Sequence, residues 1–163
     1  MSKRELKKYL SELSQEQLAE QIIDLYDKFK DVKSYYDFAF NPKEDKLLEE
    51  AKFKIGKEYF PTTRRKAKLR RSVAQKIIRQ YKQLGVDPNL IADIMLYNIE
   101  VAQTYSMDKP PKQDSFYLSL HKSFKEATDF MMEHGIYSDF EYRIQQIIDQ
   151  AWAQNWINKG AFE

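Results

Sequence analysis

The sequence predicts an all-α protein, arranged either as a single-domain helical bundle or as a short stack of αα-hairpins, with about seven helices. Glycine and proline are scarce, at four and five of 163 residues, which leaves few residues for turns and hairpins. Apolar residues recur at helical spacing over most of the chain, and helix-capping residues stand before several of these segments. The length suits one domain, residues 1–163.

Two helices are predicted to begin at capping boxes near the N-terminus. In a capping box, the first side chain and the side chain three positions later satisfy free backbone amides at a helix start. Ser2 with Glu5, and Ser14 with Gln17, have this spacing. Apolar residues at helical spacing follow the second box, so we expect that helix to run to about Phe29.

Two further helices are predicted to begin where a capping residue precedes proline. Asn41 stands before Pro42, and Asp87 before Pro88, which is the residue best suited to the first helical position. The apolar stripe after Pro42 stops near residue 61. Apolar residues after Pro88 surround almost the whole circumference, which is typical of a buried helix. We therefore predict that residues 88–105 form the central core helix.

Glycines divide the second half of the chain into two predicted αα-hairpins. Gly85 and Gly135 stand where helices should end in a left-handed turn. A proline-containing loop at residues 107–114 precedes a helix over residues 115–134, and Ser138 with Glu141 offers a capping box for the last helix. The 50-residue spacing of the turns fits a compact bundle and a short stack equally well.

The charge is distributed unevenly along the chain, although the net charge is only +2. Residues 52–82 contain twelve Lys and Arg against one acid, Glu58, and so carry +11. Residues 1–51 carry −3 (nine bases, twelve acids), and residues 83–163 carry −6 (six bases, twelve acids). Such asymmetry concerns binding partners rather than the fold.

The most basic part of this segment is predicted to be a loop, residues 61–71, that leads into a helix. A longer helix would project Arg70 into its own apolar face, whereas Ser72 with Gln75 offers a capping box that starts the helix later. Basic side chains at a helix N-terminus repel one another, and the free amides there attract anions. The predicted anion-binding or partner-binding residues are Arg64, Arg65, Lys66, Lys68, Arg70, Arg71, Arg79 and Lys82, with Tyr59, Phe60 and Trp156 as candidate aromatic contacts.

This segment favours a non-catalytic binding or adaptor protein that contacts an acidic partner surface through residues 62–82. The alternative is an RNA- or DNA-binding protein that contacts phosphates through the same residues. One aromatic pair is fewer than single-strand binders use, and no standard nucleic-acid motif is evident. The loop is also interpretable as a solvated segment that only balances the acidic remainder of the chain. The third hypothesis is an enzyme whose distant carboxylates and tyrosines are brought into one pocket by folding.

Catalytic and metal-binding patterns are not found in the sequence, so we predict no enzyme, no metal and no cofactor. The chain has no cysteine, and its glycines form neither a phosphate loop nor a nucleophile elbow. His121 and His134 are about 220° apart on one helix and cannot share a metal unaided. The acids Glu126, Asp129 and Glu133 align on one helix and are interpreted as a solvated face.

A soluble, cytoplasmic protein without membrane contact is expected. The basic N-terminus is followed by no apolar segment of signal-peptide length. The longest stretch without a charged residue is residues 150–158, less than half of the roughly 20 residues that a membrane helix needs. The oligomeric state is left open.

Three segments, "YYDFAFNPKEDKLLEEAKFKIGKEYFP", "RRSVAQKIIRQYKQLGVDP" and "IADIMLYNIEVAQTYS", together resemble an uncharacterised family of small bacterial proteins known only as a domain of unknown function. The resemblance covers nearly the whole chain. It implies a helical, cytosolic protein, and it brings no activity, ligand or catalytic residue with it.

Overall fold

A computed structural model describes residues 1–162, and it confirms the all-α fold. The described residues form eight α-helices and one short 3-10 helix, without a strand. They divide into two compact units, Met1–Lys43 and a second unit that begins at Glu44. A single domain over residues 1–163 stays a prediction.

The first unit consists of α1 (Lys3–Ser11), α2 (Gln15–Lys28) and α3 (Lys30–Phe40). The predicted capping boxes at Ser2 and Ser14 are both present. Phe29, which has extended backbone angles, separates α2 from α3 and confirms the predicted end of α2. None of the three helices contains a buried residue.

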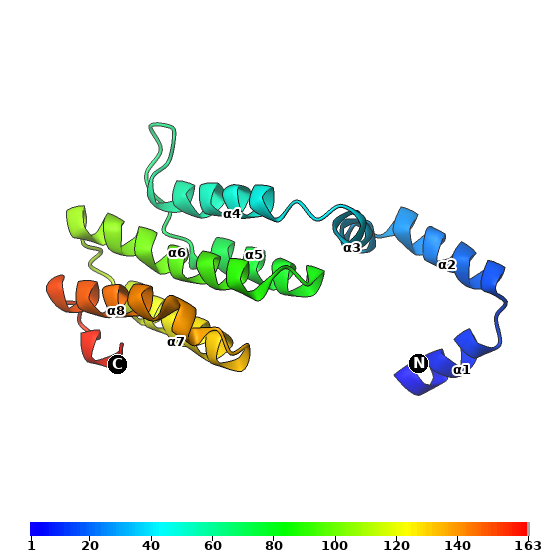
Figure 1. Ribbon diagram of the computed structural model, residues 1–163. Helices are drawn as coiled ribbons and strands as arrows, with labels where there is room; N and C mark the ends of the chain where they lie inside the picture. The colour runs from blue at the N-terminus through cyan, green and yellow to red at the C-terminus, as the bar shows by residue number, and fades with distance from the viewer. Residues whose placement is uncertain (163) are drawn as a thin grey trace. The chain divides into compact units, whose positions relative to one another are not determined.

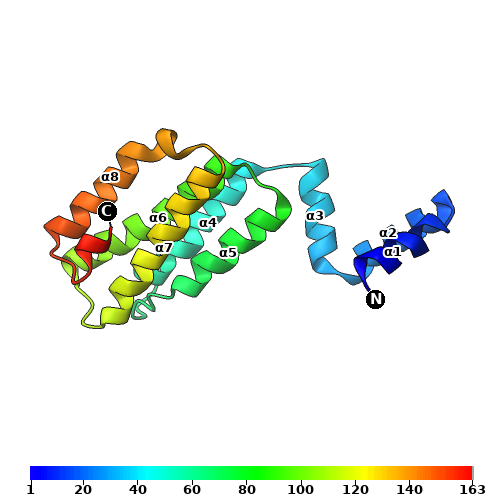
Figure 2. The ribbon, with the colours of Figure 1, turned by 90° about the horizontal axis from the view of Figure 1, so that it is seen from below.

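The second unit is a bundle of five α-helices with α6 at its centre (Figures 1 and 2). Its elements are α4 (Glu44–Tyr59), α5 (Arg71–Leu84), α6 (Pro88–Asp108), α7 (Asp114–Glu133), α8 (Tyr137–Ala153) and the 3-10 helix η1 (Lys159–Ala161). Helix α6 packs against α4, α5, α7 and α8. Leu96, Ile99 and Ala102 of α6 are fully buried, so the prediction of a central core helix is confirmed.

The turns between these helices lie where the glycines and Pro88 predicted them. Gly85 and Gly135 have φ values of 74° and 68°, in the left-handed region where glycine has no Cβ penalty. Asp87 caps α6 by accepting a hydrogen bond from the Asn89 amide at 2.7 Å, directly before Pro88. The two predicted helix ends and this helix start are confirmed.

Three other helix starts were placed wrongly. Helix α4 begins at Glu44, two residues beyond Pro42. Helices α5 and α8 begin before the predicted capping boxes, and their N-cap residues, Arg70 and Ile136, make no side-chain capping bond. At α8, the tight turn after Gly135 leads directly into the helix. At α5, Arg70 stands at the N-cap with extended backbone angles and therefore does not enter the apolar face.

The chain after α8 turns back onto the bundle and buries Trp156, one of the candidate aromatic contacts. Asn155 has a φ of 50°, and the amide of Trp156 donates to the carbonyl of Ala151 at 3.0 Å. Trp156 is consequently 3% exposed and packs against Phe116, whereas Trp152 is 47% exposed. Helix α8 ends at Ala153, so Trp156 lies beyond it.

No helix within residues 1–162 combines the length and the hydropathy that crossing a bilayer requires.

Candidate binding surface at the basic loop

The basic loop, residues 61–70, connects α4 to α5 and extends away from the end of α4 in Figure 1. The predicted loop is therefore confirmed, with α5 beginning at Arg71. Helix α4 ends just before Phe60 and Pro61, and proline cannot continue the helical hydrogen bonding. Leu69, near the other end of the loop, has a left-handed φ of 54°.

Glu58 holds the two ends of the basic loop together. Its backbone carbonyl accepts hydrogen bonds from the amides of Lys68 and Leu69, at 2.9 and 3.1 Å. Its carboxylate accepts two more from the guanidinium of Arg70, at 2.8 Å from Nε and 2.7 Å from Nη2. Such a two-pronged arginine–carboxylate pair fixes orientation as well as distance. The base of the loop is therefore closed.

The Arg70 pair also controls the ionisation of Glu58. The side chain of Glu58 is only 11% exposed, so a carboxylate there requires a partner. Hydrogen bonding from Arg70 lowers the pKa of the Glu58 carboxyl below its ordinary value of 4.5, although burial acts in the opposite direction. The single acid of the +11 segment is thus used to fix the loop rather than to offset its remaining charge.

Four basic residues of the loop are exposed and form no ion pair with a described residue: Arg64, Arg65, Lys66 and Lys68. Three of them, Arg64, Arg65 and Lys66, line a groove of about 710 Å³ at the loop. Helix α6 contributes Tyr105 and Asp108 to this groove, and Lys109 follows directly after it. The groove is basic on balance, with Asp108 as its one acidic lining residue.

Phe60 is the aromatic residue that this groove presents to solvent. It is 47% exposed, and its ring meets that of Tyr105 edge to face at 5.9 Å. The other two candidate aromatic contacts, Tyr59 and Trp156, are each 3% exposed. Burial raises the pKa of Tyr59 to about 12. Of the three candidates, Phe60 alone offers a ring to a partner.

Arg71 is directed into the bundle instead of toward solvent. Its Nε donates to Ser123 Oγ at 2.6 Å, its Nη2 donates to Glu126 at 2.8 Å, and its side chain is 17% exposed. Glu126 is therefore the ion-pair partner of Arg71, although its own side chain stays 42% exposed. The anions expected beside the two arginines at the start of α5 are carboxylates of the chain itself, Glu58 and Glu126.

Arg79 and Lys82, farther along α5, belong to a different groove. This groove, of about 610 Å³, also contains the three acids Glu126, Asp129 and Glu133 of α7. The Lys82 ammonium lies 4.2 Å from the centroid of the Phe130 ring. The structure therefore separates the predicted basic residues into a basic loop and a mixed-charge groove between α5 and α7.

The histidines and acids do not form a recognisable metal site. Within the part of the chain that the structure describes, no three His, Cys, Asp or Glu residues are grouped so that they could hold a metal ion. His121 packs edge to face against Phe162, with ring centroids 5.5 Å apart. The Nδ1 of His134 lies 2.8 Å from the Phe130 carbonyl oxygen, as expected for a residue at a helix C-terminus.

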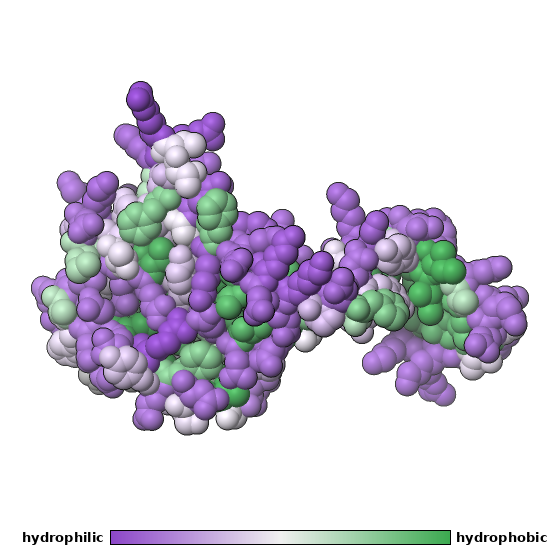
Figure 3. Space-filling view, turned by 45° about the horizontal axis from the view of Figure 1, so that its top comes forward, coloured by the Kyte–Doolittle hydropathy of each residue, from purple (hydrophilic) through white to green (hydrophobic). Residues whose placement is uncertain are grey.

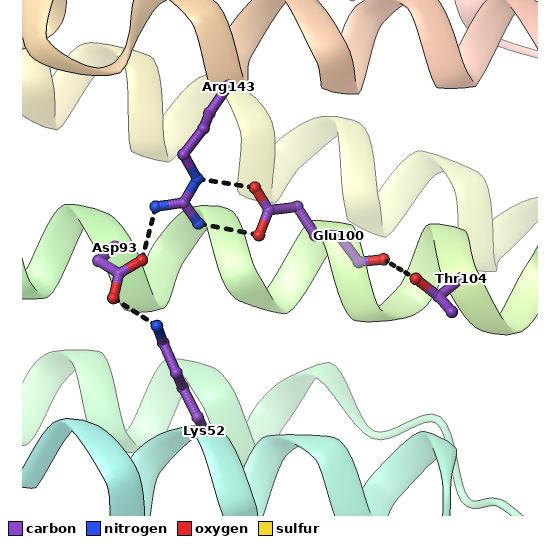
Figure 4. A network of polar contacts seen from close by, with 5 residues as sticks. All are labelled: Lys52, Asp93, Glu100, Thr104 and Arg143. Atoms are coloured by element: carbon purple, nitrogen blue, oxygen red, sulfur yellow. Dashed lines mark hydrogen bonds and ion pairs between the residues drawn. The ribbon is translucent and has the colours of Figure 1, made fainter.

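A charged network that sequence reasoning missed joins α4, α6 and α8 (Figure 4). Arg143 donates two hydrogen bonds to Glu100, both at 2.8 Å, and one to Asp93 at 2.5 Å. Lys52 pairs with the other oxygen of Asp93 at 2.6 Å. These residues lie up to 91 positions apart, so no spacing rule could connect them. Lys52, one of the twelve bases of residues 52–82, is therefore paired with a carboxylate of α6.

The whole chain, residues 1–163, matches the model of the Family of unknown function (DUF6155), and the protein belongs to this family. Its predicted membership of an uncharacterised family is confirmed. No curated protein matches the chain. No solved structure matches it either.

Proposed function

For this member of a family of unknown function, we propose a non-catalytic binding or adaptor role, in which the basic loop contacts an acidic surface of a partner protein. The observation that carries the proposal is the set of four exposed cations that have no carboxylate partner among residues 1–162: Arg64, Arg65, Lys66 and Lys68. Neighbouring cations of the same segment, such as Arg70 and Arg71, do have carboxylate partners.

The physical basis of the proposal is the mutual repulsion of these four cations, which the loop holds close together. Cations clustered in one loop raise the local potential, and an anionic partner relieves it. The Glu58–Arg70 pair fixes the loop ends, so less conformational entropy is lost on binding than from a free tail. The contact is expected to be salt-sensitive, because all four side chains are exposed. A cytoplasmic location fits this role and stays a prediction.

Nucleic-acid binding through the same loop is the second candidate, and Phe60 is the observation that favours it. An exposed ring beside arginines can stack on an unpaired base while the cations contact phosphates. Only this one ring is available among the three aromatic candidates, which is why we rank an acidic protein surface first. Single-stranded RNA would be the preferred nucleic acid in this case.

The experiment compares two variants that remove the same charge from different surfaces. The loop variant carries Arg64→Gln, Arg65→Gln, Lys66→Gln and Lys68→Gln. The matched control carries Arg79→Gln, Lys112→Gln, Lys122→Gln and Lys125→Gln, which are also exposed. Fluorescence anisotropy measures the binding of labelled oligoglutamate, oligouridylate and a DNA duplex, at low and at physiological salt.

We expect oligoglutamate to bind about tenfold more weakly to the loop variant, because four exposed contacts of a few tenths of a kcal/mol each add to roughly 1.4 kcal/mol. The control variant should stay within about twofold of the unmodified chain. Tighter binding of oligouridylate with a steeper salt dependence would favour the nucleic-acid alternative. Absence of binding to all three probes at low salt would reject both versions.

A further inference from the structure

The groove beside the basic loop has an apolar floor in addition to its cations. Phe60, Pro61 and Ala67 line it from the chain between α4 and α5, and Tyr105 lines it from α6. Phe60 is 47% exposed, whereas the other three are half-buried. A ligand that covers this floor therefore removes aromatic and aliphatic surface from water while it meets the cations.

The Phe60 ring is fixed by its neighbours. It meets the Tyr105 ring edge to face, and the centroid of the Tyr105 ring lies 6.1 Å from that of the buried Tyr59. The amide of Phe60 donates to the Gly56 carbonyl at 2.8 Å, which continues the hydrogen bonding of α4. Because the ring is already ordered, little conformational entropy is lost when a partner packs on it. Figure 3 shows hydrophilic side chains on the projecting loop and hydrophobic ones beside its base.

The charges around this floor favour carboxylates at separate positions over a continuous chain of phosphates. The loop supplies three cations to the groove, whereas on the α6 side Lys109 stands next to Asp108. A nucleic acid strand carries a phosphate at each nucleotide and is repelled where it passes Asp108, but a peptide can place an uncharged residue there. The volume of about 710 Å³ lies within the range of roughly 300–1,000 Å³ that is typical of ligand pockets. A few residues of a partner chain therefore fit.

We propose that the partner segment bound in this groove is an acidic peptide with one aromatic or large aliphatic residue. That residue packs on Phe60, and flanking carboxylates meet Arg64, Arg65 and Lys66. The inference rests on the proposed function and specifies the chemistry of the partner. In protein interfaces a buried apolar or aromatic anchor supplies much of the affinity, while charges around it guide the encounter. A purely acidic segment would leave the Phe60 ring in water, and a purely apolar one would leave the cations without counter-charge.

Two labelled peptides of equal length and charge test the anchor. Both are oligoglutamate with one central uncharged residue, which is serine in the first peptide and phenylalanine in the second. Fluorescence anisotropy with the full chain should show about tenfold tighter binding of the phenylalanine peptide, because its ring and the half-exposed Phe60 ring are buried together. Phe60→Ser should reduce this preference to within about twofold and change the affinity for the serine peptide by less than about twofold.

Phe53→Ser is the matched control, because Phe53 is 60% exposed on α4 but lies outside the lining of the groove. This variant should keep the full preference for the phenylalanine peptide. Equal binding of the two peptides, weakened together in the loop variant, would overturn the anchor and leave the proposed function standing. Absence of binding by either peptide would overturn both. Tighter binding of oligouridylate than of the phenylalanine peptide would assign the groove to nucleic acid and also overturn the inference.

A cross-linking experiment tests the contact on the unmodified chain, so that it does not depend on the folding of Phe60→Ser. The central residue of the peptide is replaced by p-benzoylphenylalanine, which cross-links to nearby C–H bonds under ultraviolet light. Mass spectrometry of proteolytic fragments should locate the cross-link at Phe60, Pro61 or Tyr105. Cross-links confined to other segments, such as the groove around Arg79 and Lys82, would overturn the inference.

Discussion

Glu58 decides the state of the basic loop at the scale of single residues. It is the one acid among residues 52–82, and its carboxylate and its backbone carbonyl each accept two hydrogen bonds. Removal of its charge leaves the Arg70 guanidinium without a counter-charge, so that only the backbone bonds from Lys68 and Leu69 to the Glu58 carbonyl hold the loop end. The residue should therefore affect both stability and loop order.

Glu58→Gln should lower the free energy of unfolding by about 1–2 kcal/mol at neutral pH, since charged hydrogen bonds are lost. Because the folded-state pKa of Glu58 lies below the ordinary 4.5, its carboxylate stabilises the fold above about pH 4.5. This contribution is lost as the pH falls through the folded-state value. Urea unfolding at pH 7 and pH 3 should show a difference between variant and unmodified chain that shrinks at pH 3. An equal difference at both pH values would contradict the assigned ion pair.

The sequence shows which side chains are basic, but it did not predict which of them pair with a carboxylate of the chain. Arg70 and Arg71 were expected to hold an external anion, yet their partners are Glu58, 12 positions back, and Glu126, 55 positions ahead. Capping boxes and apolar stripes report contacts within one helix. Pairs between helices depend on how the bundle packs, which no local pattern encodes.

At the scale of the elements, α6 organises the second unit. Apolar residues around its circumference and the Asp87–Pro88 start can both be recognised in the sequence of this one segment. The position of α6 was therefore predicted correctly. Helix α3 has no comparable signal, because only Phe29 separates it from α2 and this residue makes no side-chain capping bond. Asp93 and Glu100 on the half-exposed side of α6 meet Arg143 from α8, and this contact ties the two helices together.

Arg143→Gln should lower the free energy of unfolding by about 1–3 kcal/mol, because Asp93 and Glu100 lose their shared arginine in a partly buried setting. Arg79→Gln is the matched control: Arg79 is exposed and has no carboxylate partner among the described residues, so its change should stay within about 0.5 kcal/mol. Urea denaturation at pH 7 measures both. Equal losses for the two variants would show that the network contributes nothing beyond a surface charge.

At the scale of the whole molecule, the uneven charge of the sequence pointed to the basic loop of the second unit, which we propose contacts the partner. The role of the first unit could not be predicted, because amphipathic stripes do not reveal what covers them, and none of its three helices contains a buried residue.

The central claim, that the basic loop is the binding surface, is tested most directly by mapping amide chemical shifts of the full chain as oligoglutamate is added. We predict that the amides of residues 61–70 and of Lys109 shift progressively, while those around Arg79 and Lys82 stay in place because three acids share their groove. Shifts centred on Arg79 and Lys82, with the loop amides unchanged, would contradict the account.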